Sequence, residues 1–484
     1  ADSSFAEDVV RRSLRKGASA AEVVVRDETD FAVTVRLGEV ETLTEADSRA
    51  LGLRVLLDGR QASVSTSDFS TAAIDDLVEQ AVALARATSV DESADLPDAS
   101  LMATELPDLE LFDDELARMS ADAKIDMALR CEQASRDYDP RIVNFDRGGL
   151  QTSVGTTVLA NSLGFAAAYR STVISIAAVP VARDGDQMQR DYWYDVRRSL
   201  AELEDPESIG VKAARRAIRR LGARKIASCE VPVVFEPTIS RDLLSTIFQA
   251  VSGDSVYRKA SFLVDRLGER VTANGLSIVD DGRMRGGLGS RPFDAEGLST
   301  KRTQVVADGV LESYLHNTYT GRKLGMTSTG NATRGLVGQP GVGPGNLYIE
   351  PGTASPESIL SSVRRGLLVT ELIGFGVNVV NGDFSRGAAG VWIENGQLGH
   401  AVEEREIAAP SERIRAAEAH WIATVENPPA QGSLEQPDPH QRGRAGRLIV
   451  ARALASPSRF DGAKPLDHHA VVGAMRAEME WEAE

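Results

Sequence analysis

Cysteine is nearly absent from this sequence, which has only Cys131 and Cys229 in 484 residues. Two cysteines cannot build the disulfide framework of a small secreted domain, and such sparse thiols are typical of the reducing cytoplasm. We therefore expect a cytoplasmic protein. We interpret Cys229, which precedes a buried strand, as an unreactive core thiol.

Histidine is also scarce, and its spacing excludes a self-contained zinc peptidase of the H-E-x-x-H type. No two of the six histidines lie one helical turn apart, as that motif requires. The adjacent pair, His468 and His469, directs its side chains apart on a helix or a strand. Serine–histidine catalysis is poorly supplied as well, because His316 is the only possible base before residue 400. The six histidines are His316, His400, His420, His440, His468 and His469.

The sequence also has fewer basic than acidic residues, and it has no long apolar run. Lys and Arg total 54 against 71 Asp and Glu, which gives a formal net charge of −17. Nucleic-acid binding requires a surplus or a patch of cations to neutralise phosphates, so we expect no nucleic-acid partner. No apolar run approaches about 18 residues, so we expect no membrane span. Residues 1–20 mix charges throughout, so we expect no signal peptide.

The composition that remains is globular, with 42% hydrophobic and 26% charged residues. At about 150 residues per domain, the length predicts two or three domains. Residues 1–225 combine period-two strands, an Asp58-Gly59 hairpin turn and an amphipathic helix over residues 72–87. This pattern predicts a helix-covered antiparallel or mixed sheet. Residues 88–110 are acidic and contain proline, which is typical of a solvent-exposed linker.

A second domain is expected over residues 226–409. Before it, residues 205–221 form a basic amphipathic helix whose Arg and Lys side chains are predicted to make a solvated face. The domain begins with the strand Glu230–Phe235, followed by a helix that Pro237 begins and Gly253 ends.

Glycine is concentrated in this second domain and the strand signals vanish after it. Residues 275–345 contain 15 glycines, which favour turns, bulges and close backbone approaches over long helices. The fold class predicted is therefore α+β, with a glycine-rich, β-dominated C-terminal domain. Residues 410–484 are expected to form an irregular tail, in which Arg447 to Leu454 is the best helical candidate.

One segment groups polar side chains that suit a binding site. Asp383-Phe-Ser-Arg386 places an acceptor, a hydroxyl and a guanidinium on a glycine-flanked turn, which could hold a peptide backbone or carboxylate. The alternative, which we prefer, is that Asp383 and Arg386 satisfy the turn and each other. Ser252-Gly253-Asp254 is first interpreted as a helix terminus with a capping acid.

Several of these segments together resemble one known family. They are Glu230–Phe235, Ser252-Gly-Asp254, Gly330-Asn331 and, most specifically, Gly382-Asp-Phe-Ser-Arg-Gly-Ala-Ala-Gly-Val-Trp-Ile-Glu-Asn-Gly396. The sequence resembles the TldD/TldE (PmbA) family over roughly residues 20–408. The resemblance implies two subunit types of one fold that form a heterodimeric zinc metallopeptidase. In that family the TldD-type chain carries the metal on an H-E-x-x-x-H helix, which the TldE-type chain lacks.

The helix that corresponds to the metal-binding helix here reads Leu243-Leu-Ser-Thr-Ile-Phe-Gln-Ala250. It contains no His, Glu or Cys, and Asp242 alone cannot supply a tetrahedral zinc site. The chain therefore resembles the TldE/PmbA type. We expect it to bind no cofactor or metal itself, with zinc held by a partner subunit.

The resulting functional hypothesis is a non-catalytic subunit of a TldD/TldE-like zinc peptidase acting on peptides and unfolded chains. Its expected partners are a TldD-like zinc-binding subunit and peptide substrates, and no catalytic residue is expected in this chain. Two alternatives stay open: a stand-alone peptide-binding or regulatory module, and a hydrolase that uses Asp254 or Asp383 without zinc. The candidate peptide-contact residues are Asp254, Asn378, Asp383, Ser385 and Arg386.

The ending of the sequence departs from the family pattern. Family members finish with short strands after the Trp-Ile-Glu-Asn-Gly segment, whereas Pro410 to Glu484 does not resemble that ending. Either the C-terminal domain is completed differently, or the tail is a frame-shifted product. We expect nearly all of the core to be complete by Ile407, so that removal of the tail changes stability little.

Overall fold

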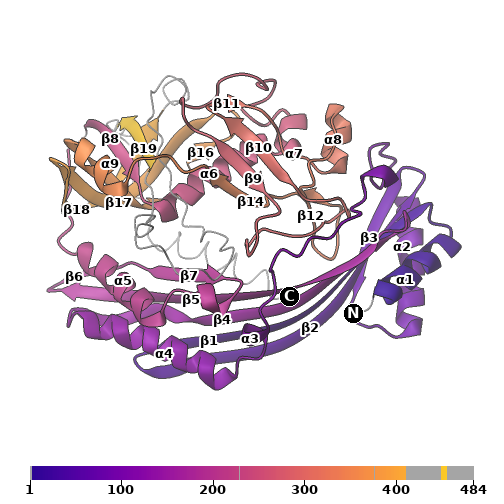
Figure 1. The fold of residues 1–484 in the computed structure, drawn as a ribbon, viewed down its shortest axis with the longest axis horizontal. Helices are drawn as coiled ribbons and strands as arrows, with labels where there is room; N and C mark the ends of the chain where they lie inside the picture. The colour runs from indigo at the N-terminus through magenta and orange to yellow at the C-terminus, as the bar shows by residue number, and fades with distance from the viewer. Residues whose placement is uncertain (1–2, 228, 375, 410–448, 455–484) are drawn as a thin grey trace.

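The computed structural model describes residues 3–227, 229–374, 376–409 and 449–454. The secondary structure is mixed α+β, as the sequence predicts. A large curved sheet from the N-terminal half faces a second, β-rich body (Figure 1). Within the described residues, no helix combines the length and the apolar character needed to cross a bilayer.

The N-terminal sheet has seven strands in the order β3-β2-β1-β4-β5-β6, with β7 also paired to β5. Apolar residues at alternate positions of β1 give one buried face, which includes Val23, Val25, Phe31 and Val33. The strands are β1 (Ala20–Arg36), β2 (Glu39–Leu57), β3 (Arg60–Thr66), β4 (Ile142–Asn161), β5 (Ala166–Asp184), β6 (Gln187–Arg190) and β7 (Trp193–Arg197).

Helices cover the outer face of this sheet at its two ends (Figure 1). Helices α1 and α2 pack on Val23 and Val25, whereas α4 packs on Phe31 and Val33. Helix α2 matches the predicted helix over residues 72–87, and Ser70 caps its N-terminus. The helices are α1 (Ser3–Arg15), α2 (Thr71–Ala87), α3 (Asp114–Ala117), α4 (Ala121–Tyr138) and α5 (Pro206–Arg219).

The C-terminal body is built around a closed ring of five strands. Strand β8 pairs with β15 and β19, β18 pairs with β19 and β17, and a β15–β17 pairing closes the ring, with β16 attached to β17. The strands are β8 (Glu230–Phe235), β15 (Arg365–Ile373), β16 (Val377–Asn378), β17 (Asp383–Glu394), β18 (Gln397–Ala409) and β19 (Ile449–Leu454).

The glycine-rich stretch forms short strands and loops, as predicted. A four-stranded sheet has the order β11-β10-β9-β14, and β12 pairs with β13. These strands are β9 (Ile278–Asp281), β10 (Arg302–Ala307), β11 (Val310–Leu311), β12 (Ala332–Thr333), β13 (Gly341–Val342) and β14 (Asn346–Ile349). The helices of this body are α6 (Pro237–Val251), α7 (Gly253–Tyr257), α8 (Thr318–Leu324) and α9 (Pro356–Ser362).

One expectation about the tail is wrong where the structure describes it. Residues Ile449–Leu454 are the strand β19 and not a helix. The ring closes through β19, whereas the expectation that nearly all of the core is complete by Ile407 stays a prediction. Strand β19 runs antiparallel to β8, from Ile449 opposite Phe235 to Leu454 opposite Glu230. A central strand needs hydrogen-bonding partners on both edges, and β19 supplies the second one for β8. The rest of the predicted irregular tail, residues 410–448 and 455–484, lies outside the described residues.

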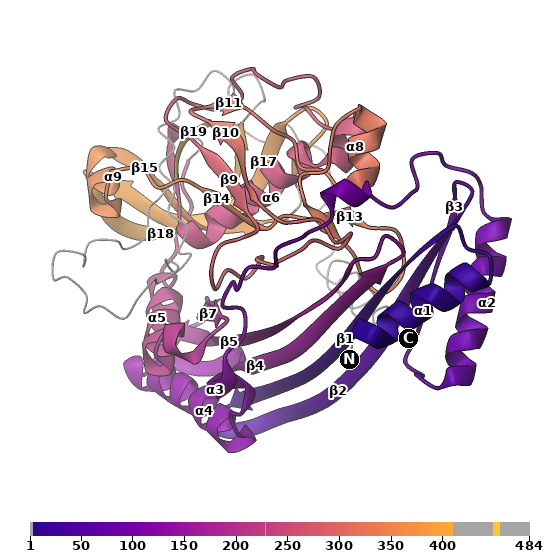
Figure 2. The same ribbon diagram turned by 45° about the vertical axis from the view of Figure 1, so that its right-hand side comes forward.

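The prediction that the acidic segment over residues 88–110 is a solvent-exposed linker is wrong for part of the segment. Ala94, Leu96 and Leu109 are buried, and a short 3₁₀ helix spans Ala99–Leu101. The Arg322 guanidinium donates to the Leu96 carbonyl at 2.5 Å, which ties the segment to α8. The segment is therefore a strap that connects the sheet to the C-terminal body (Figure 2).

Candidate functional site

Helix α6 separates two hollows in the protein. Pro237 occupies its first turn, where the missing N–H costs nothing, and Glu236 is the N-cap residue. Positions three and four apart form one stripe of Arg241, Leu244 and Ser245 toward the first hollow. The adjacent stripe, with Leu243 and Ile247, borders the second hollow, and Leu244 lines both hollows.

The first hollow is a cleft of about 420 Å³ between β7 of the N-terminal sheet and α6 of the C-terminal body. Residues 288–289 and residues 344–347, which include the start of β14, complete its walls. We call it the α6 cleft. Its lining residues from β7 and α6 are Trp193, Tyr194, Asp195, Val196, Arg197, Pro237, Thr238, Arg241, Leu244, Ser245 and Phe248.

An arginine and two aromatic residues give the α6 cleft its chemical character. The Arg241 guanidinium donates to the Tyr194 hydroxyl at 2.8 Å and lies 6.0 Å from the centre of its ring. Tyr194 stacks on Tyr192, with ring centres 6.0 Å apart. Trp193 lines the same wall. Flat rings beside a guanidinium can bind the backbone, the apolar side chains and the carboxylates of a peptide.

The cleft does not fit a zinc ion. Its one carboxylate, Asp195, already accepts from the backbone N–H groups of Val196 and Glu204 and pairs with Arg197. The one acid on α6, Asp242, lies 3.3 Å from the Arg386 guanidinium. In the part of the chain that the structure describes, no three His, Cys, Asp or Glu residues gather as a metal-binding group. Zinc coordination needs several such ligands in tetrahedral reach.

The start of α6 is held by buried charges from α5. The Arg216 guanidinium donates to Glu236 at 2.6 Å and to Asp191 at 3.2 Å. Burial alone would lower the pKa of Arg216, but Glu236 and Asp191 raise it above its usual value. The predicted solvated face of α5 is therefore wrong for Arg216, which is 5% exposed. The reason is that acids from two other elements pair with it.

The second hollow is an apolar pocket of about 120 Å³ behind α6. We call it the apolar pocket. Phe262, Val377 and Phe384 line it together with Leu243 and Ile247 of α6. The β16–β17 hairpin forms one of its walls through Val377 and Phe384.

Four of the five predicted peptide-contact residues lie together on the β16–β17 hairpin. The side chain of Asn378 accepts from the Val380 N–H at 2.9 Å, and Asp383 accepts from Asn381 Nδ2 at 2.7 Å. Ser385 is exposed, and its N–H donates to the Gly376 carbonyl at 2.6 Å. Because Arg386 pairs with Asp242, this hairpin is joined to α6.

The fifth predicted residue, Asp254, lies on another element. It belongs to α7, which packs against α6, α8 and β13. Among the described residues that line the α6 cleft, none of the five predicted residues occurs. Their role in contacting a peptide stays a prediction.

The residues that build the α6 cleft were missed in the sequence, although a signal exists. Aromatic residues make up only 5% of the chain, yet Tyr192, Trp193 and Tyr194 are consecutive. Such a cluster on a strand next to a helix is a stronger indication of a binding surface than a single polar turn.

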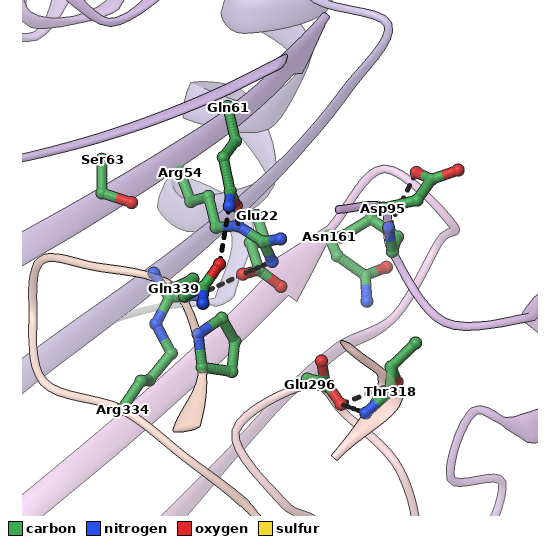
Figure 3. A network of polar contacts seen from close by, with 12 residues as sticks. Glu22, Arg54, Gln61, Ser63, Asp95, Asn161, Glu296, Thr318, Arg334 and Gln339 are labelled. Carbon is green, nitrogen blue, oxygen red and sulfur yellow. Dashed lines mark hydrogen bonds and ion pairs between the residues drawn. The ribbon is translucent and has the colours of Figure 1, made fainter. Parts of the chain in front are cut away.

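A buried polar network joins the N-terminal sheet to the C-terminal body beside strand β1 (Figure 3). Glu22 is fully buried, accepts from Arg54 Nη1 at 2.9 Å and pairs closely with Arg334. Burial would raise the pKa of Glu22, but Arg334 and Arg54 lower it below its usual value. Gln61 donates to Gln339 at 2.7 Å at the edge of this network.

Two further acids are buried in the same region. Glu296 accepts from the N–H and the hydroxyl of Thr318, at 2.9 and 2.7 Å. Burial raises the pKa of Glu296 most, and the negative charge of the nearby Asp294 raises it further. Asp294 accepts three backbone N–H groups, so it organises a turn. We interpret these acids as parts of the contact between the N-terminal sheet and the C-terminal body, which we call the domain seam, and not as a reactive pair.

Comparison with known proteins identifies the architecture. A model of the PmbA/TldA metallopeptidase domain 1 matches residues 21–85, one of the central domain matches residues 114–221, and one of the C-terminal domain matches residues 228–413. The crystal structure of TldE from Thermococcus kodakarensis has the same fold, with a TM-score of 0.80 and 22% identity. That match covers 93% of this chain and 99% of the other.

Curated relatives agree with this architecture. The metalloprotease PmbA of Escherichia coli O157:H7 is 39% identical over 388 residues, 80% of this chain and 84% of the relative. A PmbA homologue from Haemophilus influenzae is 37% identical over 400 residues, 82% of this chain and 86% of the relative. The fold thus defines a metallopeptidase scaffold with a cleft beside α6. The chain belongs to the PmbA/TldD family, and its relatives point to a role in proteolysis.

Proposed function

We propose that this chain is the non-catalytic subunit of a heterodimeric zinc peptidase that processes peptides and unfolded chains. The observation that carries the proposal is the stripe of α6 that faces the cleft. This stripe presents Arg241, Leu244 and Ser245, none of which is a usual zinc ligand. A family member of this kind needs the metal and the water-activating group to come from a second, TldD-like subunit.

The α6 cleft is the surface that supports a peptide substrate. The cleft lies between strand β7 and helix α6, and Trp193, Tyr194 and Arg241 line its walls. An extended peptide could stack side chains on the rings and place a carboxylate or carbonyl on the guanidinium. A folded domain does not enter a cleft of about 420 Å³.

The proposal also covers the cellular compartment, which is the cytoplasm, and the residues that contact the peptide. Both cysteines are free, which suits the cytoplasm. The β16–β17 hairpin, with Asn378, Asp383 and Ser385, is proposed as a second peptide-contact surface, because it is exposed and is joined to α6 through Arg386.

A stand-alone peptide-binding module is the second candidate. The observation that favours it is the lining of the α6 cleft, where Trp193, Tyr194 and Arg241 suit a peptide and none is a usual zinc ligand. A hydrolase using Asp254 or Asp383 has no such support, because α7 and the β16–β17 hairpin hold these two acids apart from the cleft.

The test is to mix this chain with a TldD-like chain that carries the H-E-x-x-x-H motif and to follow cleavage of an unstructured fluorogenic peptide. The proposal expects activity only in the mixture, and loss of that activity with a zinc chelator. Activity of this chain alone that survives the chelator would contradict it. Peptide binding by this chain without any activity in the mixture would favour the second candidate.

The role of the cleft is tested with Arg241→Ala in the same mixture. Loss of the guanidinium should raise KM for the peptide about tenfold or more, since a hydrogen bond to a charged group contributes about 1.5–3 kcal/mol. Arg118→Ala, at the exposed C-cap position of α3, is the matched control and should leave KM unchanged. An unchanged KM for Arg241→Ala would contradict the claim that the α6 cleft binds the substrate peptide.

A further inference from the structure

Strand β2 has a long edge that no described strand covers. It pairs with β1 along its whole length, but β3 covers its other edge only from Leu51 to Leu57. From Glu39 to Arg49 every residue is exposed. In Figures 1 and 2 this part of β2 forms the margin of the sheet away from the C-terminal body. We call residues 39–50 the β2 edge.

The β2 edge has some, but not all, of the features that protect an exposed strand. Edge strands present unpaired N–H and C=O groups, and proteins protect them with charged side chains, Pro, bulges or short length. The β2 edge carries acidic residues and one register shift against β1, opposite Thr34 and Val35. The segment Glu-Val-Glu-Thr-Leu-Thr-Glu-Ala-Asp-Ser-Arg-Ala contains neither Lys nor Pro. It is also long, because 12 residues at about 3.4 Å each span roughly 40 Å. An edge of this kind is a ready template for a strand from another chain.

The outer face of the β2 edge is apolar at one end and acidic at the other. Val40 and Leu43 are 42% and 48% exposed and lie opposite Val35 and Val33 of β1. Helix α4 packs on β1, β4 and β5, so it leaves both side chains uncovered. Farther along, Glu45 lies opposite Phe31, and Asp47 lies opposite Thr29.

We propose that the β2 edge is the docking site for a β-strand of a second, non-identical protein chain. That strand carries apolar side chains opposite Val40 and Leu43, and Lys or Arg opposite Glu45 and Asp47. The inference rests on the proposed function, and it names the surface by which the metal-binding subunit is held.

Substrate peptides are a poorer fit to this edge. The α6 cleft is bordered by β7, which pairs with β5 on the far side of the sheet. Strands β1, β4 and β5 separate it from β2. A strand docked on the β2 edge is therefore remote from the cleft, which suits a permanent subunit contact.

A second copy of this chain is also a poorer fit. Two copies of the β2 edge could pair antiparallel about residue 45, 46 or 47. The first register places Glu45 opposite Glu45, the second places Glu45 opposite Asp47, and the third places Asp47 opposite Asp47. Like charges directly opposite each other destabilise a strand pair. The net charge of −17 adds long-range repulsion between copies.

The experiment measures association of the full-length chain with a TldD-like chain that carries the H-E-x-x-x-H motif, by analytical ultracentrifugation and surface plasmon resonance. The variant is the pair Leu43→Lys and Asp47→Lys. The matched control is Leu84→Lys and Asp76→Lys on α2, which makes the same change in composition and charge at exposed positions. Circular dichroism confirms that both variants are folded.

The expected result is a dissociation constant at least tenfold larger for the β2 variant and unchanged for the control. Wild-type binding should also weaken as salt rises, because acidic and basic groups meet. If the wild type binds and the β2 variant binds equally well, the edge proposal is overturned while the proposed function stands. If the wild type does not bind at all, the proposed function fails and the edge proposal falls with it. A wild-type homodimer that the β2 variant abolishes would overturn the claim of a non-identical partner.

Discussion

Glu22 shows how a single carboxylate holds the two halves of the molecule together. It is fully buried on β1, pairs with Arg54 of β2 and reaches Arg334 of the C-terminal body (Figure 3). Removing one partner of a buried ion pair leaves the others uncompensated. The position is visible in the sequence only as an acid in an apolar strand, because its arginine partners lie 32 and 312 residues away.

Replacement of Glu22 by Ala is expected to destabilise the protein by about 3–5 kcal/mol, because Arg54 and Arg334 stay buried without a counter-charge. Urea unfolding followed by circular dichroism measures this loss. Glu28→Ala on the same strand, at a half-buried position, is the control and should change stability by about 0.5 kcal/mol or less. Equal effects of the two substitutions would show that the seam does not depend on Glu22.

His316 gives a prediction about pH. It is 2% exposed, and burial lowers its pKa to about 4. An unfolded histidine has a pKa of about 6.5, so the unfolded chain takes up the proton first. The stability that neutral His316 contributes is therefore complete above about pH 6.5 and is lost as the pH falls toward 4.

When the pH falls from 7.5 to 5, protonation of His316 in the unfolded chain should lower the free energy of unfolding of the wild type by about 2 kcal/mol. A His316→Gln variant should not show this loss. Urea unfolding of both proteins at the two pH values measures the difference. The same comparison with His400→Gln controls for the loss of any histidine. Parallel pH profiles for the wild type and His316→Gln would contradict the prediction.

Elements were predictable where local patterns dominate. The helix at 72–87, the Asp58-Gly59 turn and the α6 helix follow from periodicity, turn chemistry and Pro237. Strand β19 was mistaken for a helix because the alanines and arginines of its segment favour helices, whereas its pairing with β8 is a long-range contact. The strap over residues 88–110 was misjudged for the same reason, since its buried residues contact elements distant in the sequence.

Removal of β19 is expected to open the five-strand ring. A chain that ends at Ala409 should unfold at a markedly lower urea concentration, whereas a chain that ends at Pro457 should behave like the full-length protein. In the full-length chain, Val450→Pro should have an effect of about 3 kcal/mol, because proline removes a ladder hydrogen bond. An unchanged midpoint for the chain that ends at Ala409 would restore the expectation that the tail is dispensable.

The candidate site was predictable only in part at the level of elements. The Gly382–Gly396 segment carries the family resemblance and forms β17 and its turns, so the sequence located the hairpin that borders the apolar pocket. The α6 cleft was not located, because it is assembled from β7, α6 and two further segments that are separate in the sequence. Proximity of this kind depends on how the sheet and the C-terminal body pack, which no local pattern encodes.

At the scale of the whole molecule, the proposed function treats this chain as a subunit that works with another chain. The described chain has a cleft suited to peptides on one side of the sheet and an unprotected strand edge on the other. Family membership indicates a role in proteolysis. In the proposed function the metal chemistry belongs to the partner, because Arg241, Leu244 and Ser245 of α6 face the cleft without a usual zinc ligand.

The most direct test of this central claim is the zinc content of the chain, purified alone and dialysed against metal-free buffer, by inductively coupled plasma mass spectrometry. A chain without a metal-binding helix should retain far less than one zinc per molecule, because one or two isolated ligands cannot hold zinc through dialysis. About one tightly bound zinc per chain would contradict the account, since it would place a complete metal site in a subunit that we propose has none.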